Sequence, residues 1–334
     1  MLSKSNENEK GIGMKKIERA KANVYEIDHR LAPAITVKQG EHFVLETEDA
    51  ASGYIREESF LPYPKNRPTH RCNPALLNPV AGPVFIEGAE KGDLVVVTIE
   101  KIVPDSQGYT ILQPGDGLLG DSLKYRKTND FYTRIFKHIP GASGTLADGA
   151  CVLNERVRWR MAPFIGTLCL APEREVPSSV YVQGPWGGNL DSHDFCEGSK
   201  IYLNSYTEGG MLFAGDVHGC QGDGELSGTA NETRAELTLS CTVIKGKKIP
   251  HVRIEKPETI VGVATGKPLE FAVRDAFINL LEWVKEEYGF EEREAYLLLT
   301  ACPDCRINVY QMVDLPSFFY TAGVEIPQKY LVSH

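Results

Sequence analysis

Short runs in which apolar and polar residues alternate occupy most of the chain up to about residue 260. Glycine, proline, asparagine or aspartate separates these runs, which predicts β-strands joined by turns rather than helices. Many short strands of this kind are typical of an all-β sandwich or barrel. We expect strands over 34–37, 42–47, 83–87, 93–99, 152–159, 164–170, 199–203, 236–244 and 251–255.

Helical periodicity appears only near the C-terminus. Ala272, Ala276 and Leu280 recur at helical spacing and predict the apolar face of a helix over 269–288, with Gly289 as its C-terminal cap. A second, shorter helix completes an αα-hairpin, and two strand-like runs follow it. These three elements are expected over 291–300, 306–313 and 318–326.

These patterns divide the chain into four segments. Residues 1–20 are expected to be a flexible tail and residues 21–180 a β-rich lobe. Residues 181–250 form a β-rich segment that carries the candidate active site, and residues 251–334 form an α+β part. Residues 105–145 are rich in glycine, aspartate and tyrosine without a clear period, so we expect a long loop region over the site.

Composition and charge exclude several classes of protein. Hydrophobic residues make up 42% and charged residues 24% of the chain, which excludes disorder over its whole length. The net charge of -9 argues against a nucleic-acid partner, because nucleic-acid-binding domains are normally basic. No apolar stretch predicts a transmembrane helix, and the N-terminus lacks the apolar region of a secretory signal. We therefore expect a cytoplasmic protein without a membrane partner, with its 8 cysteines reduced.

Two glycine-rich segments concentrate the candidate chemistry. The segment 184–193 contains Asp191, and the segment 215–225 contains Asp216 and His218. On an extended strand, Asp216 and His218 point to the same side because they are two positions apart. A hairpin that joins the segments would bring all three side chains together. If it does not form, each segment is a polar surface turn.

Two carboxylates and an imidazole with one open position are typical ligands of catalytic zinc. A metal held by Asp191, Asp216 and His218 would polarise a carbonyl and activate a water molecule. Zinc is the expected cofactor, and another divalent metal is the alternative. Glu225 would be the general base that takes the water proton and passes it to the leaving group.

Several motifs resemble those of one family. Residues 215–230 read GDVHGCQGDGELSGTA and resemble the signature of the acetamidase/formamidase family. Residues 187–191 (GGNLD), 82–93 (GPVFIEGAEKGD) and 163–167 (PFIGT) resemble further elements, in the family's order. The chain departs from the family pattern where Gly219 follows His218 and where Lys91 replaces a proline, and residues 105–145 show no close match.

The resemblance implies an amidohydrolase that cleaves the C–N bond of short linear amides, such as formamide and acetamide, to a carboxylate and ammonia. It also implies a jelly-roll-like sandwich plus a β-barrel with a small α+β part, and a homo-oligomer. In this reaction Asn189 and Gln221 could position the amide nitrogen. Backbone N–H groups around Gly219 and Gly222, together with the metal, would stabilise the oxyanion.

Two other functions stay open at this point. Cys220 lies among glycines beside His218 and would be the nucleophile of a thiol amidase. The other function is a non-catalytic small-molecule or metal-binding protein on the same scaffold.

Two further assignments concern His193 and the pair Cys302 and Cys305. His193 is either a fourth metal ligand or a partner of a ligand, and Cys302 and Cys305 are expected to be ordinary thiols.

Overall fold

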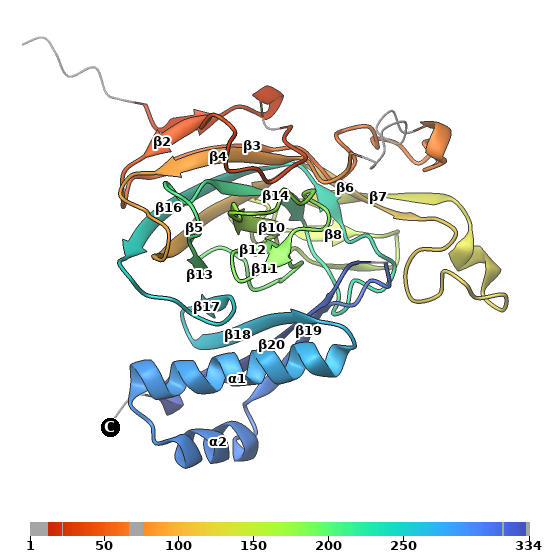
Figure 1. Cartoon of the computed structure of the whole chain (residues 1–334). Helices are drawn as coiled ribbons and strands as arrows, with labels where there is room; N and C mark the ends of the chain where they lie inside the picture. Colours follow the sequence, from red (N-terminus) through yellow and green to blue (C-terminus); the bar gives the residue numbers. More distant parts are fainter. Residues whose placement is uncertain (1–12, 22, 67–75, 316, 332–334) are drawn as a thin grey trace, which may run out of the picture.

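The computed structural model describes residues 13–21, 23–66, 76–315 and 317–331. Two β-sheets share one large core, and two helices cover one end of the first sheet (Figure 1). The mainly β fold with a C-terminal αα-hairpin is confirmed. Among the described strands, neither sheet closes into a barrel.

The first sheet has nine strands and draws them from the beginning, middle and end of the chain. Its neighbours are antiparallel except for β1 and β3, which run parallel. In spatial order the strands are β1 (Lys15–Ile17), β3 (Phe43–Thr47), β16 (Ala235–Ile244), β5 (Leu94–Pro104), β13 (Lys200–Asn204), β17 (Arg253–Glu255), β18 (Thr259–Gly266), β20 (Tyr320–Pro327) and β19 (Arg306–Gln311).

The second sheet has eleven strands and carries both glycine-rich segments. Its main path is β11 (Gln183–Gly184), β12 (Gly187–Asn189), β10 (Phe164–Leu170), β14 (Leu212–His218), β15 (Glu232–Thr233), β6 (Gln107–Leu112), β7 (Tyr132–Ile139), β8 (Ala150–Val152) and β9 (Arg158–Arg160). Beside this path, β4 (Val80–Ile86) pairs with β14, and β2 (Ile35–Val37) pairs with β4.

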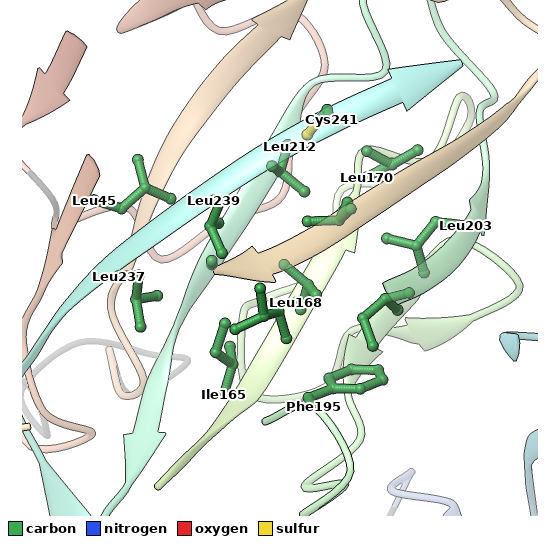
Figure 2. Packing of buried hydrophobic residues seen from close by; sticks show 14 of the residues in the cluster. Leu45, Ile165, Leu168, Leu170, Phe195, Leu203, Leu212, Leu237, Leu239 and Cys241 are labelled. Atoms are coloured by element: carbon green, nitrogen blue, oxygen red, sulfur yellow. The ribbon is translucent and has the colours of Figure 1, made fainter. Parts of the chain in front are cut away.

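The facing side chains of the two sheets form the main hydrophobic core. Leu45 and Leu239 of the nine-stranded sheet lie in one cluster with Leu168 and Leu212 of the eleven-stranded sheet (Figure 2). Each of these side chains is fully buried, which stabilises the fold by about 1.5–3 kcal/mol per residue relative to exposure. The core therefore fixes the position of β10 and β14 relative to each other.

The helices α1 (Leu269–Tyr288) and α2 (Glu292–Ala301) form the expected hairpin, and α1 packs on β18 and β20. Gly289 caps α1 in the left-handed conformation, with φ 71°. Among the described residues, no helix combines the length and the apolar character needed to cross a bilayer. Short 3₁₀ turns cover Arg19–Lys21, Pro64–Asn66, Arg126–Asn129 and Gln328–Tyr330.

The strands β14 and β18 are among those missing from the strands expected above. Every residue of β14 is buried, and β18 is buried over most of its length, so neither shows an alternation of apolar and polar residues. Gly262 in β18 faces the backbone of α1, where a Cβ would lie 2.6 Å from the carbonyl oxygen of Ala276. β14 and β18 are thus central strands, and their sequences lack the alternation of apolar and polar residues that marks a strand with one exposed face.

The expectation of one long loop over 105–145 is wrong. This region contains the strands β6 and β7, which pair with each other. Only the connection between them is irregular, and it does contact the site loop, since Leu118 N–H donates to Leu226 O at 2.7 Å. Similarly, the single strand expected over 152–159 is two short strands, β8 and β9. The strand β1 lies within the segment 1–20 that was expected to be a tail.

Candidate active site

Strand β10 places the two glycine-rich segments on its two sides. Thr167 of β10 pairs with Asn189 of β12 on one side and with Gly215 of β14 on the other. Asp191 follows β12, and its N–H donates to the carbonyl oxygen of Gly166 at 3.2 Å. The segments therefore converge across a third strand and not through the hairpin expected from the sequence.

Asp191, Asp216 and His218 come together in this arrangement. One ligand atom of each residue lies within 4.8 Å of the others, so the three form a group that could hold a metal ion. The residues are 2%, 2% and 1% exposed, respectively. Nε2 of His218 lies 3.6 Å from Oδ1 of Asp216.

Two glutamates complete the cluster. Glu225 forms a second candidate metal group with His218 and Glu232. Oε2 of Glu232 lies 3.3 Å from His218 Nε2, and the residue is 2% exposed. Sequence reasoning missed Glu232, because it lies on the two-residue strand β15 and shows no motif of its own. Its pairing with His218 across the ladder from β14 would have identified it.

The acid–base properties of the cluster follow from four buried carboxyls around one imidazole. Burial and the charge of Asp216 raise the pKa of Asp191 well above its usual value. Burial and Asp191 do the same to the pKa of Glu225. Burial raises the pKa of Glu232 to about 7. Burial alone would lower the pKa of His218, but the charges of Glu232 and Asp216 raise it well above its usual value. The cluster as a whole therefore favours a bound cation or bound protons.

Gln221 determines which nitrogen of His218 faces the carboxylates. The side-chain amide of Gln221 donates to the backbone oxygens of Asp191 and Tyr310, at 3.1 and 2.8 Å. Its Oε1 is then the acceptor for Nδ1–H of His218, at 2.9 Å. Nε2 of His218 consequently points toward Asp216 and Glu232. Gln221 thus fixes the orientation of His218, a candidate metal ligand, which differs from the expected contact with the amide nitrogen.

Asn189 is likewise occupied by protein groups. Its Nδ2 donates to the carbonyl oxygen of Val180 at 3.0 Å, and its Oδ1 accepts from Thr167 Oγ1 at 2.8 Å. Asp216 Oδ2 accepts from Asn78 Nδ2 at 2.9 Å. Asn78 lies before β4 and was missed from the sequence, because no motif links it to Asp216. Asn78 therefore holds Oδ2 of Asp216, whereas Oδ1 is the oxygen that lies 3.6 Å from Nε2 of His218.

The backbone at the site is unusual. Asp191, Asp216 and Glu225 all adopt left-handed conformations, with φ of 48°, 54° and 47°. Gly166 lies beneath the two aspartates, where a Cβ would approach Oδ1 of Asp191 to 2.9 Å and Oδ2 of Asp216 to 3.0 Å. The absence of a side chain at Gly166 therefore leaves room for the two carboxylates.

The backbone N–H of Gly219 does not serve the expected oxyanion role. It donates to the carbonyl oxygen of Asn231 at 2.8 Å, within the ladder that continues β14.

Next to Gly219, Sγ of Cys220 accepts hydrogen bonds from Trp159 Nε1 at 3.0 Å and from Asn231 Nδ2 at 3.4 Å. A hydrogen bond with Cys151 lowers the pKa of Cys220 to about 6. The thiol is therefore chemically distinctive, although it belongs to neither metal group among the described residues.

His193 also lies outside both candidate metal groups of the described residues. Its Nε2 is 3.2 Å from Asp223 Oδ1, and its Nδ1 is 3.6 Å from Asp194 Oδ1. Its ring contacts Tyr310 edge to face, at a centroid distance of 4.9 Å. Asp194 in turn forms an ion pair with Lys256 at 2.7 Å. His193 is therefore part of a neighbouring charge network.

Two adjoining cavities reach the cluster. An inner cavity of about 130 Å³ is lined by Asp191, Asp216, Glu225 and Glu232, among others. An outer cavity of about 660 Å³ is lined by Cys220 and Glu225, among others. Glu225 and Thr229 line both cavities. A small substrate in the inner cavity would thus have Glu225 beside it.

Comparisons with known proteins identify relatives of this chain over most of its length. An acetamidase from Mycolicibacterium smegmatis is 26% identical over 81% of this chain and 83% of its own length. A formamidase from Methylophilus methylotrophus is 26% identical over 84% and 83%, respectively. The crystal structure of an acetamidase from Yersinia enterocolitica has 32% identity and a TM-score of 0.81, covering 95% of this chain and 92% of its own. The family profile matches residues 14–183 and 183–330, and the chain belongs to the acetamidase/formamidase family of amide hydrolases.

Proposed function

We propose that the protein hydrolyses the C–N bond of short linear amides, such as formamide and acetamide, using water activated at a divalent metal, with zinc as the first candidate. The main observation that supports this proposal is the cluster of four buried carboxyls. Among the described residues, His218 is the only basic side chain within ion-pair distance of them. An uncompensated cluster of this charge is unfavourable in a protein interior, whereas a cation would stabilise it.

The donor set fits such a cation. Oδ1 of Asp191 and Oε2 of Glu232 are buried without a hydrogen-bond partner. Buried polar atoms are rarely left in this state unless an ion or water satisfies them. Asp191, Asp216 and His218 would be the ligands, and two oxygens with one imidazole nitrogen suit zinc. A bound cation would supply Lewis acidity, which lowers the pKa of a water molecule and polarises an amide carbonyl.

The chain's own residues would carry out the proton transfers. Glu225 accepts the proton of the attacking water and delivers it to the nitrogen of the breaking C–N bond, so the products are a carboxylate and ammonia. A raised pKa suits this residue, because it must be protonated for the second step. Gln221 holds His218, and Asn189 holds Thr167 beneath Asp216, so we assign both amides to positioning the proposed ligands. An oxyanion contact from Gly222 N–H stays a prediction.

The test is ammonia release from formamide and acetamide by the purified protein. Activity should be lost after treatment with a chelator and restored by Zn²⁺, and elemental analysis should find about one metal per chain. Insensitivity to the chelator, combined with an inactive Cys220→Ala variant, would support a thiol amidase, which the lowered pKa of Cys220 favours. No hydrolysis with any metal would indicate a binding protein. Homo-oligomerisation and a cytoplasmic location also stay predictions, testable by light scattering and cell fractionation.

A further inference from the structure

The outer cavity is much larger than formamide or acetamide requires. Acetamide is only a few atoms larger than a water molecule, which occupies about 30 Å³. The inner cavity of about 130 Å³ therefore has room for such an amide together with water. The outer cavity of about 660 Å³ lies within the range of roughly 300–1,000 Å³ typical of sites for larger organic ligands.

The walls of the outer cavity are aromatic and aliphatic. Phe136 of β7 and Trp159 of β9 contact each other edge to face, with centroids 5.8 Å apart and planes at 68°. Both rings line the cavity, together with Leu226, Ala162 and Ala230. Trp159 is 37% and Leu226 47% exposed, so these large apolar side chains face open space instead of the core. Such walls favour a planar apolar group, because aromatic rings add edge-to-face and offset contacts to area burial.

The two cavities meet at the proposed reaction centre. Glu225 and Thr229 line both, whereas Asp191 and Asp216 line only the inner one. A substrate with its amide group beside these aspartates would pass Glu225 and extend its remaining atoms into the outer cavity. Arg160 and Asp223 also line the outer cavity with opposite charges, and the Asp223 side chain is 71% exposed. Their charges oppose each other, so this lining favours a neutral substituent.

We infer that the preferred substrate is a primary amide whose acyl chain carries an aromatic ring, with the ring in the outer cavity against Trp159 and Phe136. The inference rests on the proposed amide hydrolysis. The same C–N bond breaks, and water supplies the oxygen of an arylalkyl carboxylate while the nitrogen leaves as ammonia. One methylene in an apolar pocket changes kcat/KM by about 10–200-fold. Phenylacetamide should therefore exceed acetamide in kcat/KM by at least about tenfold.

The experiment compares ammonia release from acetamide, phenylacetamide and cyclohexylacetamide by the metal-loaded protein. A matched pair of variants tests the location of the ring. Ala162 is exposed, and its backbone N–H donates to Gly219 O at 3.0 Å. Neither Ala162→Phe nor Ala162→Ser removes this hydrogen bond, so both variants should fold. Ala162→Phe should lower the ratio of kcat/KM for phenylacetamide to that for acetamide about tenfold, whereas Ala162→Ser should leave the ratio unchanged.

Each outcome decides one statement. If acetamide is hydrolysed and phenylacetamide is no better, the inference is overturned while the proposed function stands. If cyclohexylacetamide equals phenylacetamide, the cavity selects size and the aromatic class is wrong. An unchanged ratio in Ala162→Phe would show that the ring lies elsewhere and would also overturn the inference. If no amide is hydrolysed, the proposed function fails first.

Discussion

The spacing of the two site aspartates should depend on the hydrogen at Gly166. A Cβ on Gly166 would lie 2.6 Å from the carbonyl oxygen of Asp216, 2.9 Å from Oδ1 of Asp191 and 3.0 Å from Oδ2 of Asp216. The Asp216 carbonyl belongs to β14, whose neighbours Gly215 and Val217 are paired with β10, so it cannot easily retreat. In Gly166→Ala the paired strands β10 and β14 must therefore be forced apart locally, and the two carboxylates must move as well.

The magnitude follows from two effects. Overpacking of a buried site by one methyl group costs about 1–3 kcal/mol of unfolding free energy. A displacement of about 1 Å at a catalytic group lowers turnover by about 10²-fold. We expect Gly166→Ala to fold with a lower melting temperature, to bind less metal, and to lose about 10²-fold of its kcat/KM for acetamide. Backbone strain is not involved, because Gly166 lies outside the left-handed region.

Gly222→Ala provides the matched control. A Cβ at Gly222 meets nothing within 4 Å, its φ is also outside the left-handed region, and alanine keeps the backbone N–H that is predicted to contact the oxyanion. Both variants should be measured by thermal unfolding, elemental analysis and ammonia release. The reasoning is refuted if Gly166→Ala retains wild-type metal content and activity, or if Gly222→Ala loses as much as Gly166→Ala.

Three further predictions test separate parts of the site. Glu225→Gln should lower kcat about 10²–10⁴-fold while the metal content stays unchanged, and loss of the metal would instead make Glu225 a ligand. Cys220→Ala should retain most activity in the ammonia assay, and an inactive variant with its full metal content would favour the thiol. Burial opposes ionisation of Asp194, but the hydrogen bond with His193 and the charge of Lys256 outweigh it and lower its pKa. The resulting stabilisation is present above the unfolded pKa of about 4 and is lost as pH falls further. Asp194→Asn should therefore be less stable than the wild type at neutral pH by about 3–5 kcal/mol, and it should lose less stability in acid. Urea unfolding at several pH values measures both effects. Parallel curves of unfolding free energy against pH for the variant and the wild type would contradict this prediction.

The sequence predicts the proposed ligands well because they lie in short, motif-bearing segments. Asp216 and His218 are two positions apart on one strand, so a regular pleat predicts that they share a side, and they do meet although Asp216 is left-handed with φ 54°. The prediction of Asp191 as a ligand required an assumption about the tertiary structure, namely that the two glycine-rich segments meet. They do meet, although β10 lies between them. An error in the connection thus left the residue set unchanged, because both topologies bring Asp191 to Asp216 and His218.

Glu232 and Asn78 could not be predicted in the same way. Glu232 comes to His218 through a two-residue strand that pairs with β14 just beyond the point where β4 begins. Asn78 reaches Asp216 from the start of β4, far away in sequence. Neither has a motif or a period, and only the pairing of distant strands brings them to the site. Phe136 and Trp159 of the outer cavity come from β7 and β9, and they too reach the site only through the pairing of distant strands.

The backbone conformation of the site has a free-energy cost, which can be compared with the stabilisation that a bound cation would provide. Asp191, Asp216 and Glu225 hold left-handed φ values that cost roughly 1–2 kcal/mol for a residue with a side chain. Burial and the neighbouring carboxyls also raise the pKa values of Asp191 and Glu225, which opposes the ionisation of these two groups. Both terms destabilise the ligand-free protein, and the two sheets must supply the compensation through their shared core. A cation at 1,000 times its Kd would add about 4.1 kcal/mol to the folded state, which is comparable to these costs. Under the proposed function, the strained aspartates and their charge together form a preorganised site whose unfavourable features a bound cation would offset.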